Sequence, residues 1–263
     1  MGSTDDLAHD GAEAPALEIV GLHKTFGGTV AVDDVSLHVP HGSFFGLVGP
    51  NGAGKTTLLA MAVGLLRPDR GTSRLFGVDV WAQPLRARQL LGVLPDALAL
   101  PERLTGRELL TFLGQMRELD PDTIAQRTDE LLEVMELTDA ERTLVIDYST
   151  GMRKKIGLAG ALLHAPRLLV LDEPFEAVDP LSAATLKAIL QRFVAAGGSV
   201  VLSSHVMALV EQLCDRVAVI ADAVVVAAGP LEHVRGPTSL ENAFVRLVGA
   251  QVDGGEGLSW LAP

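Results

Sequence analysis

Apolar and polar residues follow two different periods along this chain, and the change of period divides it into strand-like and helix-like stretches. Runs rich in Val, Leu and Ile at residues 17–22 and 30–39 flank a glycine pair, which is typical of antiparallel strands. A further short run, residues 73–78, predicts one more strand. The segments RLLVLDEP, residues 167–174, and SVVLSSH, residues 199–205, contain continuous apolar runs. Such runs are typical of a parallel sheet that is covered on both faces.

A helical period replaces the strand pattern between Thr105 and about Leu137. Thr105 with Glu108 three residues later is a capping-box signature, which predicts a helix start. The residues that recur at intervals of three and four in the two helices expected here are Leu109, Phe112, Leu113, Met116, Ile124, Thr128, Leu131 and Met135. Helix-like stretches at residues 156–163 and 181–193 alternate with the apolar runs, so we expect a doubly wound α/β fold with a helical insertion.

The segment GPNGAGKTT, residues 49–57, joins a strand-like run to a helix-like run. Gly49, Gly54, Lys55 and Thr56 satisfy the phosphate-loop pattern G-x-x-x-x-G-K-[ST] in the setting that this pattern requires. Glycines let such a loop wrap so that its N–H groups face phosphate oxygens, and the following helix adds its positive N-terminal end. The alternative is an ordinary glycine-rich turn before a helix, which leaves Lys55 without a partner.

The polar residues of this loop have distinct expected roles. We expect Lys55 to reach the β- and γ-phosphates of a nucleotide and Thr56 to offer its hydroxyl to Mg²⁺. A phosphate loop alone leaves kinases, GTPases and ATPases open. The sequence has no N-K-x-D segment of the kind that reads guanine in GTPases, which favours ATP.

Two carboxylates end the apolar run of RLLVLDEP. A carboxylate at the carboxyl end of a strand beside a phosphate loop can hold Mg²⁺ directly or through water, and the next one can polarise the attacking water. We therefore predict Asp172 as the metal ligand and Glu173 as the general base. The alternative is an acidic loop that follows a buried strand.

Two weaker signals accompany these motifs. Ser149 is placed to cap a helix that begins near Gly151, and a helix N-terminus attracts anions. His205 stands just past a strand of the expected sheet. Taken alone, Ser149 is more often an ordinary helix cap and His205 a structural residue, and the basic residues 153–155 fit a solvated face equally well.

Together and in this order, these elements resemble the ATP-binding subunit of ABC transporters over residues 17–249. GPNGAGKTT is similar to the Walker A motif, YSTGM to the signature motif, LLVLDEP to Walker B, EAVDP to the D-loop and LSSH to the H-loop. The resemblance implies a P-loop NTPase core with a mostly parallel sheet, an N-terminal antiparallel β subdomain and an α-helical subdomain. The segments GVLPDALALPERLTGRELL and SLENAFVRLVG are similar to those of bacterial exporters that pair with ABC-2-type membrane subunits.

The resemblance also implies roles for single residues. Phe26 in KTFGG matches the aromatic residue that stacks on adenine, and its alternative is a core phenylalanine. Ser149 and Gly151 would grip the γ-phosphate bound to a second subunit, and His205 would contact that phosphate from its own side. The expected catalytic residues are Glu173, His205 and Lys55. The expected nucleotide contacts are Phe26, Gly49, Pro50, Asn51, Gly52, Ala53, Gly54, Lys55, Thr56, Thr57, Ser149, Gly151 and Asp179.

Three positions depart from the common family pattern. Asp96 stands where glutamine usually follows LP, and its charged side chain is useful beside a triphosphate only through Mg²⁺ or water. We therefore expect Asp96 as a metal ligand in addition to Thr56 and Asp172. Thr150 and Met152 replace the common glycine and glutamine of the signature. We expect an active ATPase, and the alternative is a nucleotide-gated regulatory module with weak or no hydrolysis.

Length, net charge and composition limit the classes of partner and the location that we expect for this chain. A net charge of -12 disfavours nucleic acid as a partner, and 263 residues leave no room for the long insertions of ABC-type ATPases that act on DNA. The single cysteine, Cys214, favours a reducing compartment. No apolar run approaches the roughly 18 residues of a membrane helix, and the N-terminus lacks the basic start of a signal peptide. With the resemblance, this implies ATP as ligand, a homodimer of ATPase subunits, an integral-membrane permease as partner and the cytoplasmic face of the cell membrane as location.

The pattern also suggests domain limits. Residues 1–15 are acidic and without periodicity, so we expect a disordered tail. We expect the ABC ATPase domain over residues 16–250, with its helical subdomain at about 97–155, and a C-terminal tail at 251–263.

Overall fold

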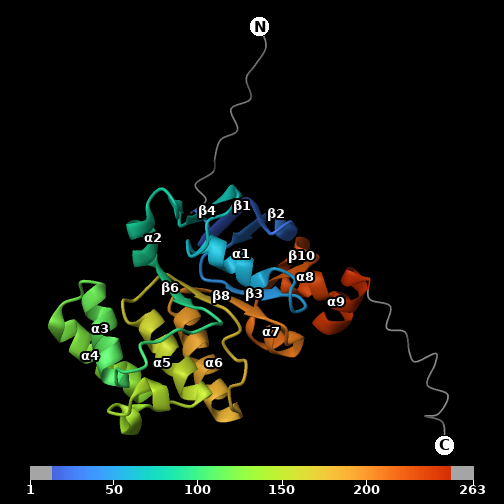
Figure 1. The fold of residues 1–263 in the computed structure, drawn as a ribbon. Coiled ribbons are helices and arrows are strands. Elements are labelled where there is room, and N and C mark those ends of the chain that lie inside the picture. The colour runs from blue at the N-terminus through green and yellow to red at the C-terminus, as the bar shows by residue number, and fades with distance from the viewer. Residues whose placement is uncertain (1–13, 250–263) are drawn as a thin grey trace, which may run out of the picture.

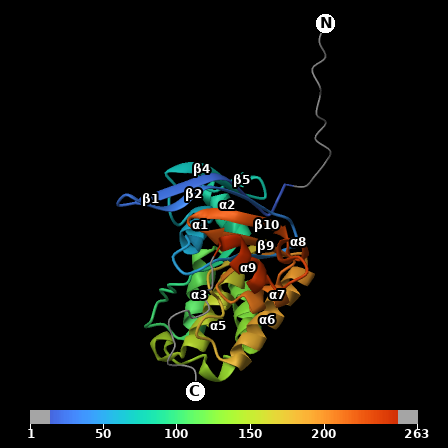
Figure 2. The same cartoon turned by 90° about the vertical axis from the view of Figure 1, so that its right-hand side faces the viewer.

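The computed structural model describes residues 14–249, which form two β-sheets and the helices packed on them (Figure 1). A small antiparallel sheet lies at the top of the view, a larger sheet crosses the middle, and most of the helices lie below. The view from the side shows the same order of layers (Figure 2). The sequence predicts each of these parts, and the expected fold class is confirmed.

The small sheet has the strand order β2-β1-β4-β5, and its paired strands are antiparallel. Its strands are β1 (Leu17–Phe26), β2 (Thr29–Val39), β4 (Arg70–Leu75) and β5 (Val78–Asp79). The pairing of β1 with β2 closes at Phe26 and Thr29, on either side of the glycine pair. The predicted antiparallel unit is therefore confirmed.

The larger sheet has the strand order β10-β9-β3-β8-β7-β6, and all its pairs are parallel except β10 with β9. Its strands are β3 (Phe44–Val48), β6 (Leu91–Leu94), β7 (Leu168–Leu171), β8 (Ser199–Ser204), β9 (Arg216–Ala221) and β10 (Val224–Pro230). Because the carboxyl ends of parallel strands meet at one edge, the loops after β3, β6, β7 and β8 come together there. The predicted motifs lie in or next to these loops.

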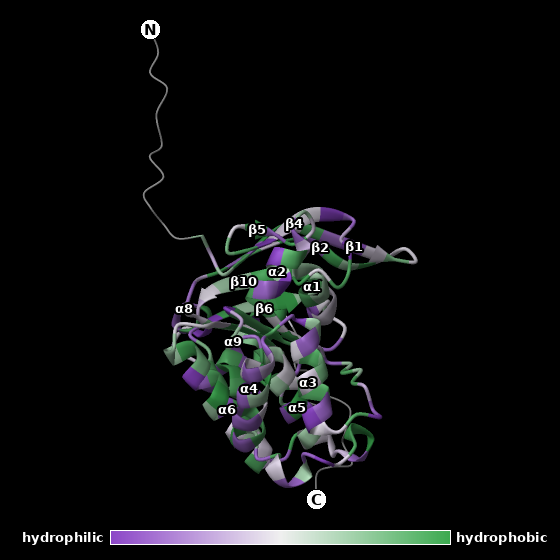
Figure 3. Ribbon diagram, turned by 90° about the vertical axis from the view of Figure 1, so that its left-hand side faces the viewer, coloured by the Kyte–Doolittle hydropathy of each residue, from purple (hydrophilic) through white to green (hydrophobic). Residues whose placement is uncertain are grey.

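Helices cover both faces of the larger sheet. Helix α1 (Lys55–Ala62) packs between the two sheets, whereas α5 (Thr150–Leu162), α6 (Pro180–Ala195) and α7 (Met207–Leu213) pack on the other face. The remaining helices are α2 (Pro84–Leu90), α3 (Gly106–Met116), α4 (Pro121–Val134), α8 (Leu231–Arg235) and α9 (Leu240–Val248), with short 3₁₀ turns η1 (Thr138–Ala140) and η2 (Val145–Asp147). Figure 3 shows apolar residues along the strands of the larger sheet and polar residues on α2, α3 and α4.

The central strand β3 divides its residues between two hydrophobic cores. Phe44 and Val48 belong to the core shared with α5, α6 and α7, whereas Phe45 and Leu47 belong to the core between the sheets. Successive side chains of a strand point to opposite faces, so a strand with helices or a second sheet on each side is buried throughout. All five residues of β3 are buried, as its continuous apolar run predicts.

The predicted strand at residues 73–78 is wrong in one respect, because a turn interrupts it. Strand β4 ends at Leu75, and Phe76 and Gly77 have φ values of 50° and 79°. Positive φ at both central residues is the geometry of a tight two-residue hairpin turn. Because Phe76 is apolar, the hydrophobic pattern of residues 73–78 gives no sign of this turn.

The predicted apolar face of α3 is also only partly right. Phe112 and Met116 are 43% and 67% exposed, whereas Leu110 is fully buried. Helix α4 comes close at Gly114, where an added Cβ would lie 2.7 Å from Ile124. The missing side chain at Gly114 lets α4 pack there and turns the buried face toward Leu110.

Most of the expected tails, residues 1–15 and 251–263, lies outside the described residues, and Ala14 and Pro15 have no regular structure. The limits of the ATPase domain and of its helical subdomain stay predictions, although α5 extends to Leu162, past the expected boundary at about 155. Within residues 14–249, no helix is both long enough and apolar enough to span a bilayer.

Candidate functional site

The predicted phosphate loop joins β3 to α1 at the carboxyl edge of the larger sheet. Its last residue, Gly54, is the N-cap of α1, has a φ of 100° and offers no side chain to cap the helix. A Cβ at this position would lie 2.1 Å from the carbonyl oxygen of Ala31 in β2, so only glycine fits. The first N–H groups of α1 are therefore left for another acceptor, as an anion site at a helix N-terminus requires.

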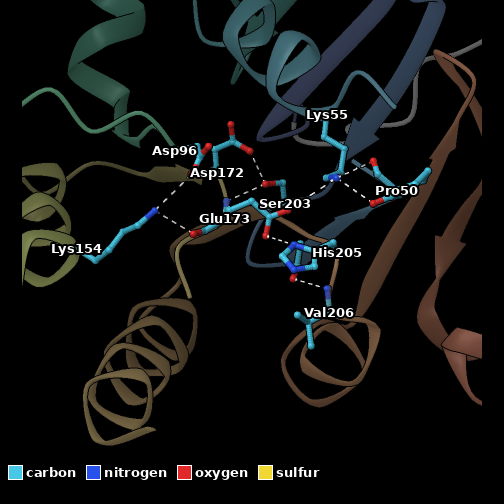
Figure 4. Close-up of polar contacts among 11 residues, drawn as sticks. Pro50, Lys55, Asp96, Lys154, Asp172, Glu173, Ser203, His205 and Val206 are labelled. Atoms are coloured by element: carbon cyan, nitrogen blue, oxygen red, sulfur yellow. Dashed lines mark hydrogen bonds and ion pairs between the residues drawn. The ribbon is translucent and has the colours of Figure 1, made fainter. Parts of the chain in front are cut away.

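Lys55 is buried at the start of α1, and its side chain turns back over its own loop. The ammonium Nζ donates to the carbonyl oxygens of Gly49 at 2.9 Å and Pro50 at 3.1 Å (Figure 4). It also lies 3.8 Å from Oε1 of Glu173, and 6% of the lysine side chain is exposed. Lys55 thus connects the loop to the residue that the sequence predicts as general base.

A cleft of about 340 Å³ opens beside the loop, a size in the range of small-ligand sites. The predicted site residues that line it are Asn51, Gly52, Gly54, Lys55, Thr56, Thr57, Asp96, Glu173 and His205. The predicted site residues outside its lining are Phe26, Gly49, Pro50, Ala53, Ser149, Gly151, Asp172 and Asp179. The structure therefore brings the loop, one acidic residue after β6, one after β7 and the histidine after β8 into one cleft.

Asp172 and Glu173 follow β7 and are connected through Ser203 near the end of β8. The Ser203 hydroxyl donates to Oδ1 of Asp172, and the Oγ of Ser203 accepts the Glu173 N–H at 2.9 Å (Figure 4). Asp172 is 5% exposed, so this hydrogen bond satisfies a nearly buried carboxylate. One hydroxyl thus orients both acidic residues.

Glu173 has a strained backbone and a carboxylate held from two sides. Its φ of 45° lies in the left-handed region, which costs a non-glycine residue roughly 1–3 kcal/mol unless its surroundings stabilise it. Oε2 lies 3.1 Å from Nδ1 of His205, while Oε1 faces Lys55 at 3.8 Å. Lys55 and His205 come from different elements, so the Glu173 carboxylate lies between the phosphate loop and the histidine at the end of β8.

Two of the three basic residues after the signature are buried. The side chains of Lys154 and Lys155 are 8% and 7% exposed. Lys154 donates to the Glu173 carbonyl oxygen at 3.0 Å and lies 3.8 Å from Oδ1 of Asp96, while Lys155 pairs with Glu136 at 2.9 Å. The alternative of a solvated face is wrong for these two lysines. Asp96 faces both the cleft and Lys154, and its role as a metal ligand stays a prediction.

The signature residues lie at the start of α5, outside the lining of the cleft. Ser149 is the N-cap of α5, and its side chain accepts the Met152 N–H at 3.2 Å. Gly151 is buried, and a Cβ there would lie 3.0 Å from Oδ2 of Asp179. The backbone and hydroxyl of Ser182 hydrogen-bond to Asp179 and lower the pKa of its carboxyl. The predicted cap is confirmed, and the predicted nucleotide contacts of Ser149, Gly151 and Asp179 stay predictions.

Phe26 ends β1 on the surface. It is 48% exposed, and the Lys24 ammonium lies 5.5 Å from its ring centroid. The alternative of a core phenylalanine is therefore wrong, and a ring face is available for stacking. Its contact with adenine stays a prediction.

The residues expected to hold Mg²⁺ fit this ion by their chemistry. Mg²⁺ prefers oxygen ligands and keeps several waters, and it is held by one or two protein groups together with phosphate oxygens. The Thr56 hydroxyl and the Asp172 carboxylate supply such oxygens; the cavity of about 50 Å³ that both residues line beside α1 is otherwise lined by apolar residues. Within residues 14–249, no group of three or more His, Cys, Asp or Glu side chains is arranged so that it could hold a metal ion.

Sequence reasoning missed Ser203 and Lys154. Ser203 is fully buried in β8, directly after the apolar run of that strand, and a buried hydroxyl needs a hydrogen-bond partner, which is a signal in the sequence once β8 is recognised. Lys154 follows Gly151 by three residues and precedes Leu158 by four, so the helical period places it on the buried face. Their partners come from other elements, and no local pattern names them.

Comparisons with known proteins agree with this geometry. Residues 32–176 match the family described as ABC transporter. The chain is 38% identical over 236 residues to the daunorubicin/doxorubicin resistance ATP-binding protein DrrA of Streptomyces peucetius, which covers 90% of this chain and 72% of that protein. It is 36% identical over 214 residues to the Nod factor export ATP-binding protein I of Bradyrhizobium diazoefficiens, which covers 81% of this chain and 70% of that protein.

A solved structure leads to the same conclusion. The structure of an ATP binding subunit of an ABC transporter matches with a TM-score of 0.82 and 29% sequence identity, over 88% of this chain and 99% of that one. The family match spans the phosphate loop, the signature and both acidic residues after β7. This chain therefore belongs to the ABC transporter family, as an ATP-binding subunit that hydrolyses ATP.

Proposed function

We propose that this subunit powers export through a separate integral-membrane subunit at the cytoplasmic face of the cell membrane. Two relatives support export as the direction of transport, because one is named for drug resistance and the other for export. The observation that carries the ATPase part of the proposal is the convergence of Lys55 and His205 on the two carboxylate oxygens of Glu173, beside the phosphate loop.

The chemistry assigned to each residue follows from its place in the cleft. The N–H groups of the loop and of the first turn of α1 receive the phosphates, and the Lys55 ammonium moves from the Gly49 and Pro50 carbonyl oxygens to the β- and γ-phosphates. Glu173 accepts the proton of the attacking water, and His205 contacts the γ-phosphate. Thr56 and Asp172 would hold Mg²⁺, which would neutralise charge on the phosphates.

We propose that two copies combine head to tail to complete two sites. Ser149 and Gly151 lie at the start of α5, outside the cleft lining of their own chain, and in this proposal they contact the γ-phosphate of nucleotide bound to the other copy. A two-fold dimer provides this contact for both copies at once. The alternative of a regulatory module without hydrolysis, suggested by Asp96 and Met152, gains no support from the family or from the cleft.

The test compares the two acidic residues. E173Q keeps the shape of Glu173 and removes the proton acceptor, so ATP and Mg²⁺ bind, turnover falls at least a hundredfold and an ATP-bound dimer accumulates. D172N weakens Mg²⁺-dependent binding and gives little dimer. Size-exclusion chromatography with ATP and Mg²⁺, run beside a phosphate-release assay, measures both outcomes. Turnover of E173Q at the unmodified rate would show that the base lies elsewhere.

The membrane partner requires its own measurement. We expect a pull-down from detergent-solubilised membranes to recover an integral-membrane subunit with the tagged chain. Recovery of soluble proteins alone would count against the export proposal and leave the ATPase part untouched.

A further inference from the structure

The side chain of Lys154 connects three parts of the chain that are distant in sequence. It extends from the second turn of α5 and ends between the loop after β6 and the loop after β7, as Figure 4 shows. Its ammonium donates to the main-chain carbonyl oxygen of Glu173 at 3.0 Å and lies 3.8 Å from the Asp96 carboxylate. The lysine thus contacts the backbone of the proposed base and leaves its carboxylate to Lys55 and His205.

The burial of Lys154 makes these two contacts significant. An ammonium that is withdrawn from water is destabilising unless polar groups surround it. With 8% of its side chain exposed, Lys154 relies on a carbonyl oxygen and a carboxylate for that purpose. An uncharged side chain of similar length would fill the same space without either interaction.

The backbone of Glu173 needs support at this point. Its φ of 45° is unfavourable for a residue with a side chain, and such a conformation persists only where neighbouring groups hold it. The N–H of Glu173 is held by Ser203 from β8, and the C=O is held by Lys154 from α5. The main-chain polar groups of the proposed base are therefore both fixed by side chains from other elements.

We propose that Lys154 is a positioning residue for Glu173 and that Asp96 tethers it. The inference rests on the proposed role of Glu173 as proton acceptor. Asp96 places the ammonium, the ammonium orients the Glu173 peptide, and the peptide sets the direction of the carboxylate. The signature helix and the loop after β6 thereby act on the proposed base of their own chain, in addition to any contact with a second copy.

The central experiment compares two neighbouring buried lysines by steady-state phosphate release. K154M removes the ammonium and keeps most of the volume, so we expect kcat to fall about tenfold while KM for ATP stays within about twofold. K155M is the matched control, because Lys155 is equally buried on α5 and pairs with Glu136. K155M should keep kcat within about twofold, and K154R, which retains charge and donors, should recover most of the loss seen in K154M. Thermal unfolding of each variant checks that it is folded.

Two double variants separate this inference from the proposed function. In the E173Q background, K154M should lower the residual rate no further, because Lys154 acts through Glu173. In the K154M background, D96N should likewise add no loss, and the Mg²⁺ concentration for half-maximal rate should be unchanged. A further loss from D96N, with a higher Mg²⁺ requirement, would show that Asp96 acts on the metal and would overturn the tether.

The outcomes that overturn the positioning role are distinct from those that overturn the base. Full activity of E173Q refutes the proposed base, whatever K154M does. If E173Q is inactive and K154M retains kcat within twofold, or loses no more than K155M, the positioning role is wrong. A K154R rate as low as that of K154M, or a further loss from K154M in the E173Q background, has the same consequence.

Discussion

Two helix N-termini of this chain are predicted to meet phosphate, and their caps differ. Helix α1 begins after Gly54, which offers no side chain, so its first N–H groups remain open toward the cleft. Helix α5 begins after Ser149, whose side chain already accepts the Met152 N–H. The two helix starts are thus prepared differently for an anion: the first is an open site, and the second is already stabilised within its own chain.

The surroundings of the two helix starts show the same difference. Lys55 at the start of α1 faces the carboxylate of Glu173 within one cleft, so both groups of the predicted phosphate site come from a single copy. Gly151 at the start of α5 packs near Asp179 and outside that cleft. The groups gathered at the start of α1 thus belong to one chain, whereas in the dimer proposed above the start of α5 meets substrate held by the second copy.

The largest effect is expected where the site at the start of α1 loses its charge. K55A should weaken ATP binding about a hundredfold, roughly 2.7 kcal/mol, because no other ammonium of the cleft lining can replace it. A fluorescent-nucleotide titration measures the change. K187A, at a lysine of α6 that hydrogen-bonds to Gln212, is the control and should bind ATP normally. Equal affinity in K55A and the unmodified chain would refute the phosphate loop as the binding site.

The second prediction tests whether α5 needs another copy. S149A removes a helix cap, which costs about 1 kcal/mol of stability, and it should reduce ATP-dependent dimer and turnover about tenfold. ATP affinity of the single chain should stay within about twofold. S239A removes the equivalent cap of α9 and should cost similar stability without loss of turnover. If S149A weakens ATP binding by the isolated chain, the two sites are not separate.

The third prediction measures how far the site at the start of α1 extends into the sheet. S203A leaves the Glu173 N–H without its acceptor and Asp172 without its donor, so kcat should fall about fivefold and more Mg²⁺ should be required. S204A, whose hydroxyl accepts the Val206 N–H, is the neighbouring control. Equal rates for both serine variants would show that β8 contributes no orientation to the acidic pair.

The smallest expected effect is a change in stability with pH that arises from His164, next to the end of α5. Burial lowers the pKa of His164, just beyond the end of α5, to about 4, and its Nε2 lies 3.0 Å from the Leu91 carbonyl oxygen. Because the unfolded chain binds this proton near pH 6.5 and the folded chain does not, stability falls as the pH drops from about 6.5 toward 4. We expect roughly 1 kcal/mol from this partly buried group.

Urea unfolding of H164Q at several pH values tests this contribution. The loss of stability between pH 6.5 and pH 4 should be shallower in H164Q than in the unmodified chain. Parallel pH curves for the two proteins would assign the acid sensitivity to other groups.

The same contrast explains what could be predicted from the sequence. Gly54, Lys55 and Thr56 act through a local loop, so their spacing alone predicts the site and the open helix start. Asp172 and Glu173 could also be predicted as site residues, because the carboxyl ends of parallel strands share one edge of the sheet. These predictions depend only on the spacing of residues within a motif and on the order of the strands, both of which can be read from the sequence.

The missed features depend on contacts between distant segments. Lys154 looks like one member of a basic run until α5 is placed against the loop after β7. Phe76 belongs to an apolar run until its backbone turns with positive φ. The exposed Phe112 shares its period with buried residues, and only the close approach of α4 decides which face of α3 is covered. Periodicity shows that a helix has an apolar face, but tertiary packing determines which residues of that face are buried.

The position of β3 at the centre of the larger sheet also determines when the chain can fold during synthesis. Strand β3 pairs with β8 and β9, and the Phe44 N–H donates to Asp215, which lies 171 residues later. At ribosomal rates of about 5–20 residues per second, β3 waits roughly ten to thirty seconds for these partners. During that interval a continuous apolar strand has both edges unpaired, the kind of segment that chaperones bind and that aggregates when left free. Assembly of the nucleotide cleft is thus a late event in the life of the nascent chain.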